Sequence, residues 1–291
     1  MNKRSLPHKI VDLTPGRRIW LQTLDLSWTR HPIFGLLEVD VTHPRRLMAA
    51  HKAKTGEGLS FTAFLACCLA RAVDEDKTVQ AYRKGRRQIV VFEDVDVAIM
   101  VENQHAGQRS LMGHVLRSVN HRTFPEIHRE IRRVQSEPPP AGRGMPGWYR
   151  SLMLLPWPLS NAAKTLVSWA SRRDPAMLAS MAGTVDITSV GMFGGGHSGW
   201  GLTTTGRSLG LVVGGIASKP AAVDGRIETR DILSLTVAFD HDVIDGGPAT
   251  RFTRRLVELI ENAYGLDVAV EGDGKRAGSA QPMPAPSPTI G

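Results

Sequence analysis

The stretch Leu235–Gly246 reads Leu-Thr-Val-Ala-Phe-Asp-His-Asp-Val-Ile-Asp-Gly. Its first five residues alternate between large apolar and smaller side chains, which predicts a strand with one buried face. His241 stands at the end of that strand, Asp245 follows four residues later, and a helix is predicted from Pro248. Since imidazole titrates near neutral pH, a histidine held in one pose can take up a proton and return it. His241 is therefore the first candidate for a proton-transfer residue.

Further strands and helices are predicted on both sides of this stretch. Helices are predicted at 61–73, 124–134 and 248–263 from apolar residues at helical spacing, and at 42–55 from Thr42 as the cap and Pro44 in the first turn. The predicted strands are 36–41, 88–101 with a break near 93–94, 109–116, 184–190, 209–217 and 235–239. Because strands and helices mix without strict alternation, the sequence predicts an α+β fold around a mixed sheet.

The chain divides into an arm at 1–16, a single domain at 17–266 and a tail at 267–291. The tail is rich in Gly, Ala, Pro and Ser, a composition typical of disorder. An insertion at 137–176 interrupts the domain with prolines and glycines, and then carries half of the six tryptophans. Four interpretations of the insertion stay open: a segment packed on its own domain, a lid, a subunit contact, or peripheral membrane contact through 145–175.

Composition limits the classes of function. The chain has 291 residues, 42% of them hydrophobic, and a net charge of +8, which favours an anionic partner. Its basic residues are spread along the chain rather than gathered in one block, so nucleic acid is not expected as a partner. Cys67 and Cys68 are adjacent in an apolar run, the pattern of a reduced, cytoplasmic protein. The N-terminal residues lack the apolar core of a signal peptide.

Metal binding is not expected either. His114, His121 and His128 are seven residues apart, a spacing that would align them on one helix. However, 109–116 is a predicted strand, and Pro125 interrupts the segment. The glycines at 194–196 lack the Gly-Lys-Ser/Thr continuation of a phosphate-binding loop.

Several segments together resemble the catalytic domain of the acyltransferase component of 2-oxo acid dehydrogenase complexes (dihydrolipoamide acyltransferase), which shares its fold with chloramphenicol acetyltransferase. The resemblance rests on Phe239–Phe252, on Gly183–Gly194, and on Val212–Ile216 with Lys219-Pro220 and Asp224-Gly225. It extends over about 18–135 and 180–264. At position 242 the chain has aspartate, whereas the family pattern has arginine after the histidine.

The resemblance implies a two-layer fold with helices on one side of a mixed sheet, in which 17–266 is the catalytic domain. It implies acyl transfer between coenzyme A, or acyl-CoA, and a thiol, hydroxyl or amine. It further implies a homotrimer whose active sites lie between subunits. We expect a stand-alone form without a lipoyl domain, and so without a covalently bound lipoyl group. No metal is expected as a cofactor.

The family's catalytic roles can be carried over to matching positions. His241 matches the general base, and Asp245 matches the carboxylate that holds its loop. Thr188 matches the hydroxyl that stabilises the oxyanion, with Ser189 as the alternative if the register differs by one residue. Arg207 and Lys219 follow core strands, but no basic residue can be selected for the phosphates of CoA.

Two other functions stay open. The chain could be a non-catalytic trimeric scaffold or regulatory protein of the same fold. It could also act in trans, as an acyltransferase component that serves a lipoyl domain on another chain.

Overall fold

The structure is a computed structural model of the whole chain. It describes residues 9–266 except for 10, 15, 19–20, 22–23, 25–26, 28–29, 106–107, 138–146, 148–150, 153, 157, 191–196 and 204–205. The predicted tail at 267–291 lies outside the described residues, as does most of the predicted arm at 1–16.

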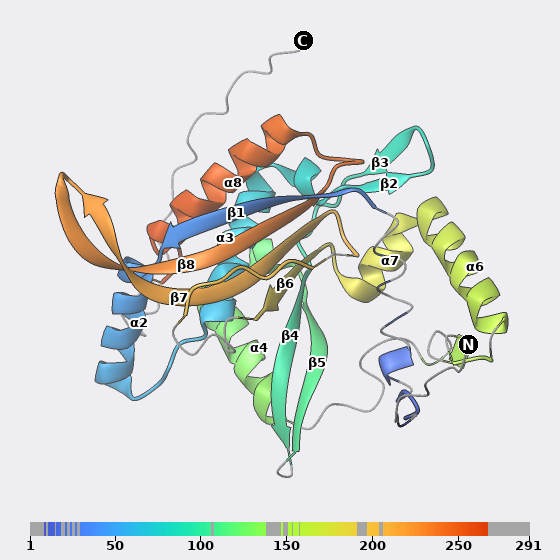
Figure 1. The fold of residues 1–291 in the computed structure, drawn as a ribbon, viewed down its shortest axis with the longest axis horizontal. Coiled ribbons are helices and arrows are strands. Elements are labelled where there is room, and N and C mark those ends of the chain that lie inside the picture. The colour runs from blue at the N-terminus through green and yellow to red at the C-terminus, as the bar shows by residue number, and fades with distance from the viewer. Residues whose placement is uncertain are drawn as a thin grey trace, which may run out of the picture.

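A six-stranded mixed sheet forms the centre of the molecule (Figure 1). In spatial order its strands are β1 (Pro32–Asp40), β8 (Arg226–Asp240), β7 (Leu209–Val223), β6 (Val185–Ser189), β4 (Val97–His105) and β5 (Gln108–Leu116). Strand β6 runs parallel to both of its neighbours, and the other pairs are antiparallel. The sequence therefore predicted the mixed α+β architecture correctly.

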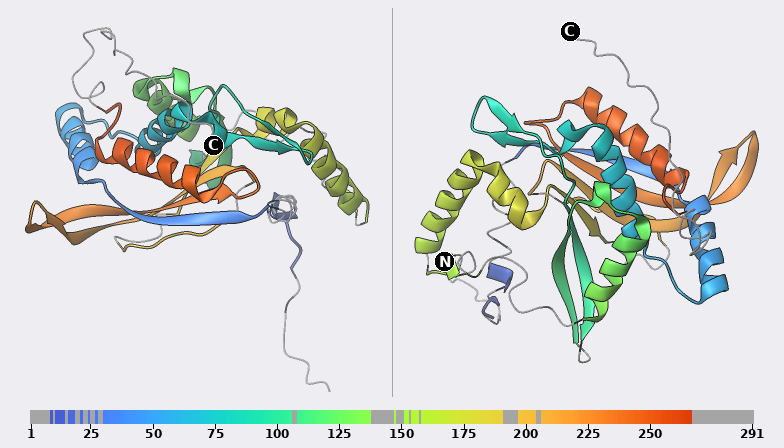
Figure 2. Two further views of the ribbon diagram at one scale, coloured as in Figure 1. Left: turned by 90° about the horizontal axis from the view of Figure 1, so that it is seen from above. Right: turned by 180° about the vertical axis from the view of Figure 1, so that it is seen from behind.

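One face of this sheet, called the helix face, is covered by the long helices (Figure 2). These are α2 (Thr42–Thr55), α3 (Phe61–Glu75), α4 (Phe124–Ser136) and α8 (Gly246–Glu261). The buried residues of β8 on this face are Leu233, Leu235, Val237 and Phe239, and the ring of Phe239 meets that of Phe252 on α8 edge-on at 5.8 Å. The alternation read from the sequence thus identified the side of β8 that faces the helices, but the other side is buried as well, at Ser234, Thr236 and Ala238.

Two elements differ from the prediction for 88–101. Strand β3 (Gln88–Val90) pairs with β2 (Tyr82–Lys84) in a separate hairpin, and the sheet strand β4 begins only at Val97. The predicted break near 93–94 therefore separates two strands that belong to different sheets. The alternation of apolar and polar residues does not distinguish this arrangement from an irregularity within one strand.

The segment around the insertion contains two further helices, α6 (Leu159–Arg173) and α7 (Pro175–Ala182). Ala163 on α6 forms a small apolar cluster with Leu152, Leu154 and Val167, separate from the main core. Helix α6 projects from the body of the molecule beyond the end of the sheet (Figure 1). No helix in the described part of the chain is long and apolar enough to cross a membrane.

On the face opposite the helices, residues 197–203 cross β7 and β8. The Gly215 amide donates to the Gly199 carbonyl at 3.1 Å, and the Gly199 amide donates to the Ser234 hydroxyl at 3.2 Å. A Cβ at Gly214 or Gly215 would lie 2.1 or 2.0 Å from a carbonyl oxygen of the crossing segment. These two glycines therefore permit the segment to lie against the sheet.

Candidate active site

His241 lies directly after β8, where the strand gives way to the loop before α8. Its backbone amide donates to the His31 carbonyl at 2.9 Å, which fixes the loop against the start of β1. The His241 Nδ1 atom lies 3.6 Å from the Asp245 Oδ1 atom, and the imidazole is 47% exposed. Asp245 is the N-cap residue of α8, where the helix dipole favours a negative charge. The structure thus brings the predicted histidine and carboxylate together.

Asp242, the residue that departs from the family pattern, is the centre of a polar cluster. His31 donates from Nδ1 to one Asp242 oxygen at 2.7 Å, and Arg83 donates to the other at 2.6 Å. Burial acts to raise the pKa of Asp242, but the hydrogen bond from His31 and the charge of Arg83 lower it below its ordinary value. The preceding Asp240 accepts from Arg30 at 2.7 Å. Both carboxylates beside His241 are therefore held by cations or donors.

Sequence reasoning missed Arg30, His31 and Arg83 as neighbours of the histidine. Arg83 is 159 residues from Asp242 in the sequence, so no local pattern connects them. The one available signal was the reversed charge at Asp242, because a carboxylate in place of an arginine requires new donors.

Thr188 lies on β6 with the orientation that alternation predicts. Val185 and Ile187 are buried on the helix face, whereas Thr188 is partly exposed and points to the opposite face. Ser189, the alternative, ends the strand and is exposed. The strand continues into a glycine-rich segment at 191–201, of which 191–196 lie outside the described residues.

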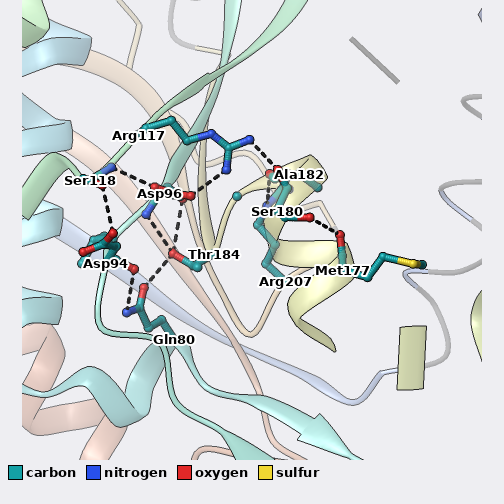
Figure 3. Close-up of polar contacts among 12 residues, drawn as sticks. Gln80, Asp94, Asp96, Arg117, Ser118, Met177, Ser180, Ala182, Thr184 and Arg207 are labelled. Carbon is teal, nitrogen blue, oxygen red and sulfur yellow. Dashed lines mark hydrogen bonds and ion pairs between the residues drawn. The ribbon is translucent and has the colours of Figure 1, made fainter. Parts of the chain in front are cut away.

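The start of β6 is fixed by a network of polar contacts (Figure 3). The Thr184 hydroxyl donates to Gln80 at 2.7 Å and accepts from the Asp96 amide at 3.0 Å. Asp96 also accepts from Arg117 at 2.6 Å. Arg117 donates to the Ser180 carbonyl as well, which places its positive charge at the C-terminal end of α7. This network locks the strand that carries Thr188 against β4 and α7.

Within one chain, Thr188 and His241 lie far apart. Thr188 on β6 pairs with Val212 on β7, and Val212 pairs with Thr236 on β8. Thr188 is therefore two strand spacings away from β8, level with Thr236, which lies five residues before His241. Standard strand rise and spacing place the two Cα atoms about 20 Å apart. A single reacting carbonyl cannot contact both side chains of the same chain, since each contact requires about 3 Å.

The comparisons with known proteins agree with the fold. The family model described as 2-oxoacid dehydrogenases acyltransferase (catalytic domain) matches residues 6–138 and 154–267. The chain belongs to this family. Residues 139–153, between the two matched segments, fall inside the predicted insertion, whereas 154–176 lie inside the second segment.

Among curated proteins, the lipoamide acyltransferase component of the branched-chain alpha-keto acid dehydrogenase complex of Bacillus subtilis is 24% identical over 87% of this chain and 52% of its own length. The chain spans about half the length of the curated relatives it matches.

Two solved structures show the same fold. A probable dihydrolipoamide acetyltransferase from Listeria monocytogenes has a TM-score of 0.64 and 21% identity, over 88% of this chain and 95% of that one. The cubic core of the pyruvate dehydrogenase multienzyme complex has a TM-score of 0.63 and 19% identity, over 89% and 94%. The two-layer arrangement expected for this acyltransferase family is therefore confirmed.

The other candidate residues of this family member have structural partners. His114 contacts Glu130 at 2.7 Å, His121 contacts Asp94 at 3.2 Å, and His128 contacts Glu57 at 2.9 Å. In the part of the chain that the structure describes, no three histidine, cysteine, aspartate or glutamate side chains form a metal-binding group. Both cysteines are buried on α3, and burial raises the pKa of the Cys67 thiol to about 12.

The two basic residues considered for the CoA phosphates are also engaged with the protein. Lys219 binds Glu38 at 2.6 Å, and its ammonium lies 6.0 Å from the centre of the Trp200 ring. Arg207 donates from Nε to the Ala182 carbonyl at 3.0 Å and lies 3.6 Å from Asp186. Neither Lys219 nor Arg207 therefore presents its positive charge beside His241.

Proposed function

We propose that this chain is a CoA-dependent acyltransferase in which His241 is the general base. The observation that carries the proposal is the loop after β8, where Asp245 lies 3.6 Å from the Nδ1 atom of a half-exposed His241. A carboxylate beside Nδ1 favours the tautomer in which Nδ1 bears the proton and Nε2 bears the lone pair. Family membership supports the same assignment, because the family is one of acyltransferase catalytic domains.

The proposed reaction is a direct transfer. His241 Nε2 takes the proton of an acceptor thiol, hydroxyl or amine while the acceptor atom attacks the thioester carbonyl. The carbonyl oxygen becomes an oxyanion, which the Thr188 hydroxyl stabilises by donating a hydrogen bond. The intermediate then collapses, the carbon–sulfur bond breaks, and the imidazolium returns its proton to the departing CoA sulfur. The transfer needs neither a covalent enzyme intermediate nor a metal.

The site is proposed to lie between subunits of a homotrimer. The separation of about 20 Å between Thr188 and His241 in one chain excludes a site made from both residues of the same subunit. A closed ring of subunits can bring His241 of one chain to Thr188 of the next. The related cubic core is consistent with a ring of three, since a cube has threefold axes.

The identity of the acyl acceptor distinguishes a stand-alone acyltransferase from a component that acts in trans on a lipoyl domain. The curated relatives are named as dihydrolipoyllysine-residue succinyltransferase and lipoamide acyltransferase components, which favours a lipoyl group carried in trans as one acceptor. A hydroxyl or amine acceptor would fit the same chemistry. A non-catalytic scaffold, in contrast, would keep the fold and release no thiol.

Release of free CoA from a panel of acyl-CoAs, measured by chromatography with and without dihydrolipoamide, tests the proposal. Wild type is compared with His241→Ala and with His43→Ala, which removes an exposed imidazole on α2. Release that His241→Ala removes and His43→Ala preserves is the expected result, and a stimulation by dihydrolipoamide would identify the in-trans role. Release that is equal in all three proteins would contradict the assignment of His241.

A further inference from the structure

The β2–β3 hairpin concentrates positive charge in a few residues. Residues 82–90 read Tyr-Arg-Lys-Gly-Arg-Arg-Gln-Ile-Val, with four cations and no carboxylate. The cations at 83, 84, 86 and 87 are all exposed, and the turn between the strands contains Gly85 with φ of +63°. A left-handed residue of this kind closes a short, defined turn, so the cations are held on a structured element.

This hairpin is attached to the loop that carries His241. Arg83 donates to Asp242 at 2.6 Å, and Asp242 is the residue directly after the histidine. At the base of the hairpin, the buried Tyr82 hydroxyl lies 3.0 and 3.1 Å from the Gly183 and Thr184 carbonyls. Figure 1 shows the hairpin beside the start of α8, at the end of the sheet where β8 finishes. The hairpin that carries the charged turn is therefore held beside the loop that carries His241.

The cations of the turn differ from the others near this site. Arg30 binds Asp240, and Arg83 binds Asp242, so each has its charge balanced. Among the residues that the structure describes, no carboxylate forms an ion pair with Lys84, Arg86 or Arg87. Three positive charges consequently face solvent without a countercharge at one edge of the candidate site.

We propose that the turn of the β2–β3 hairpin, through Lys84, Arg86 and Arg87, binds the phosphate groups of CoA. This inference rests on the proposed function, since it supplies the binding residues that His241 chemistry requires for its donor substrate. Arginine is suited to the role because its planar guanidinium can donate two parallel hydrogen bonds to one phosphate. Arg83 acts as a positioning residue, because its pairing with Asp242 sets the distance between the turn and His241.

Titration calorimetry of the full chain with CoA and with pantetheine tests this assignment independently of turnover. The variant is Arg86→Gln/Arg87→Gln, and both side chains are exposed, so folding should be preserved. Arg226→Gln is the matched control, since it removes a cation beside the turn of the β7–β8 hairpin at the opposite end of the molecule (Figure 1). We expect the Kd for CoA to rise about fivefold for each cation removed, and the Kd for pantetheine to stay unchanged. The control should bind CoA as wild type does.

Three results would overturn the assignment. CoA could bind the double variant as tightly as wild type, pantetheine could be weakened as much as CoA, or Arg226→Gln could weaken CoA to the same extent. In each case the wild type still binds CoA, and the proposed function is unaffected. Failure of the wild-type protein to bind CoA would instead remove the proposed function together with this inference.

Discussion

The segment from β8 to α8 and the segment carrying α6 and α7 differ in how they use their apolar residues. Along α8, Phe252, Leu256 and Ile260 are buried against the main core. Along α6, Leu159, Leu166 and Trp169 are 58%, 59% and 52% exposed and lie on one side of the helix. Both segments form helices, but only the first has its apolar face covered by this chain.

The difference shows what determines each segment. The loop and helix after β8 are specified by their own sequence and by an adjacent strand, so pattern and position predict the same structure. Helix α6 is supported by a small cluster around Ala163, and on its exposed side Trp169 is contacted by Arg173 of the same helix, whose guanidinium lies 4.1 Å from the centre of the ring. The lid, subunit-contact and membrane interpretations each require that side to meet something else.

The largest expected effect belongs to the first segment. His241→Ala should lower kcat/KM about 10²- to 10⁴-fold, because a general base typically supplies that factor. The steady-state rate of free CoA release measures it, with circular dichroism and size-exclusion chromatography to show that the folded oligomer persists. Full turnover in a folded variant would place the catalytic group elsewhere.

Thr188→Ala should have the next largest effect, lowering kcat about 10²-fold through loss of one oxyanion donor. Thr188→Ser keeps the hydroxyl and should retain most activity, so this pair separates hydrogen bonding from strand packing. If Thr188→Ala has an unchanged kcat while Ser189→Ala is impaired, the oxyanion role belongs to Ser189.

The contacts of Glu130 should make the free energy of unfolding depend on pH. A hydrogen bond from His114 lowers the pKa of Glu130 to about 2, against burial that acts to raise it and with further help from Arg122. Because this folded-state pKa lies below the ordinary value of 4.5, the stabilisation is present above pH 4.5 and is lost as the pH falls towards 2.

Glu130→Gln should therefore lower the free energy of unfolding by about 1–3 kcal/mol at pH 7, with the difference from wild type shrinking below pH 4.5. Urea titrations at several pH values measure it. Glu93→Gln, whose side chain is 85% exposed, is the control and should change little. A Glu130→Gln deficit that is the same at pH 3 and pH 7 would show that the carboxylate charge is not involved.

The smallest effect is expected on α6. Leu166→Gln should change the free energy of unfolding by no more than about 0.5 kcal/mol, because the side chain is already exposed. Leu256→Ala on α8, at a fully buried position, should cost about 3 kcal/mol. A Leu166→Gln loss that approaches that of Leu256→Ala would mean that α6 is covered in the assembled protein, and the contrast between the two segments would fail.

Much of the body could be predicted from the sequence because its signals are local. Alternation in Val185–Ser189 gave the orientation of Thr188, and helical spacing in 124–134 gave the buried face of α4. The spacing of His241 and Asp245 gave the centre of the candidate site.

The remaining features depend on contacts between distant segments. The Arg83–Asp242 pair connects residues 159 positions apart, and the β2–β3 hairpin turns residues predicted as part of one long strand into a separate element. No periodicity encodes such contacts, since they arise only when the sheet brings both segments to one edge.

Subunit mixing tests the central claim most directly, since that claim combines His241 of one chain with Thr188 of another. His241→Ala and Thr188→Ala are each expected to be weakly active as homotrimers. Co-refolded in equal amounts, random trimers should recover about a quarter of wild-type activity, because one site in four then combines an intact His241 with an intact Thr188 from its neighbour. No recovery in a preparation shown by native mass spectrometry to contain mixed trimers would contradict a catalytic site shared between subunits.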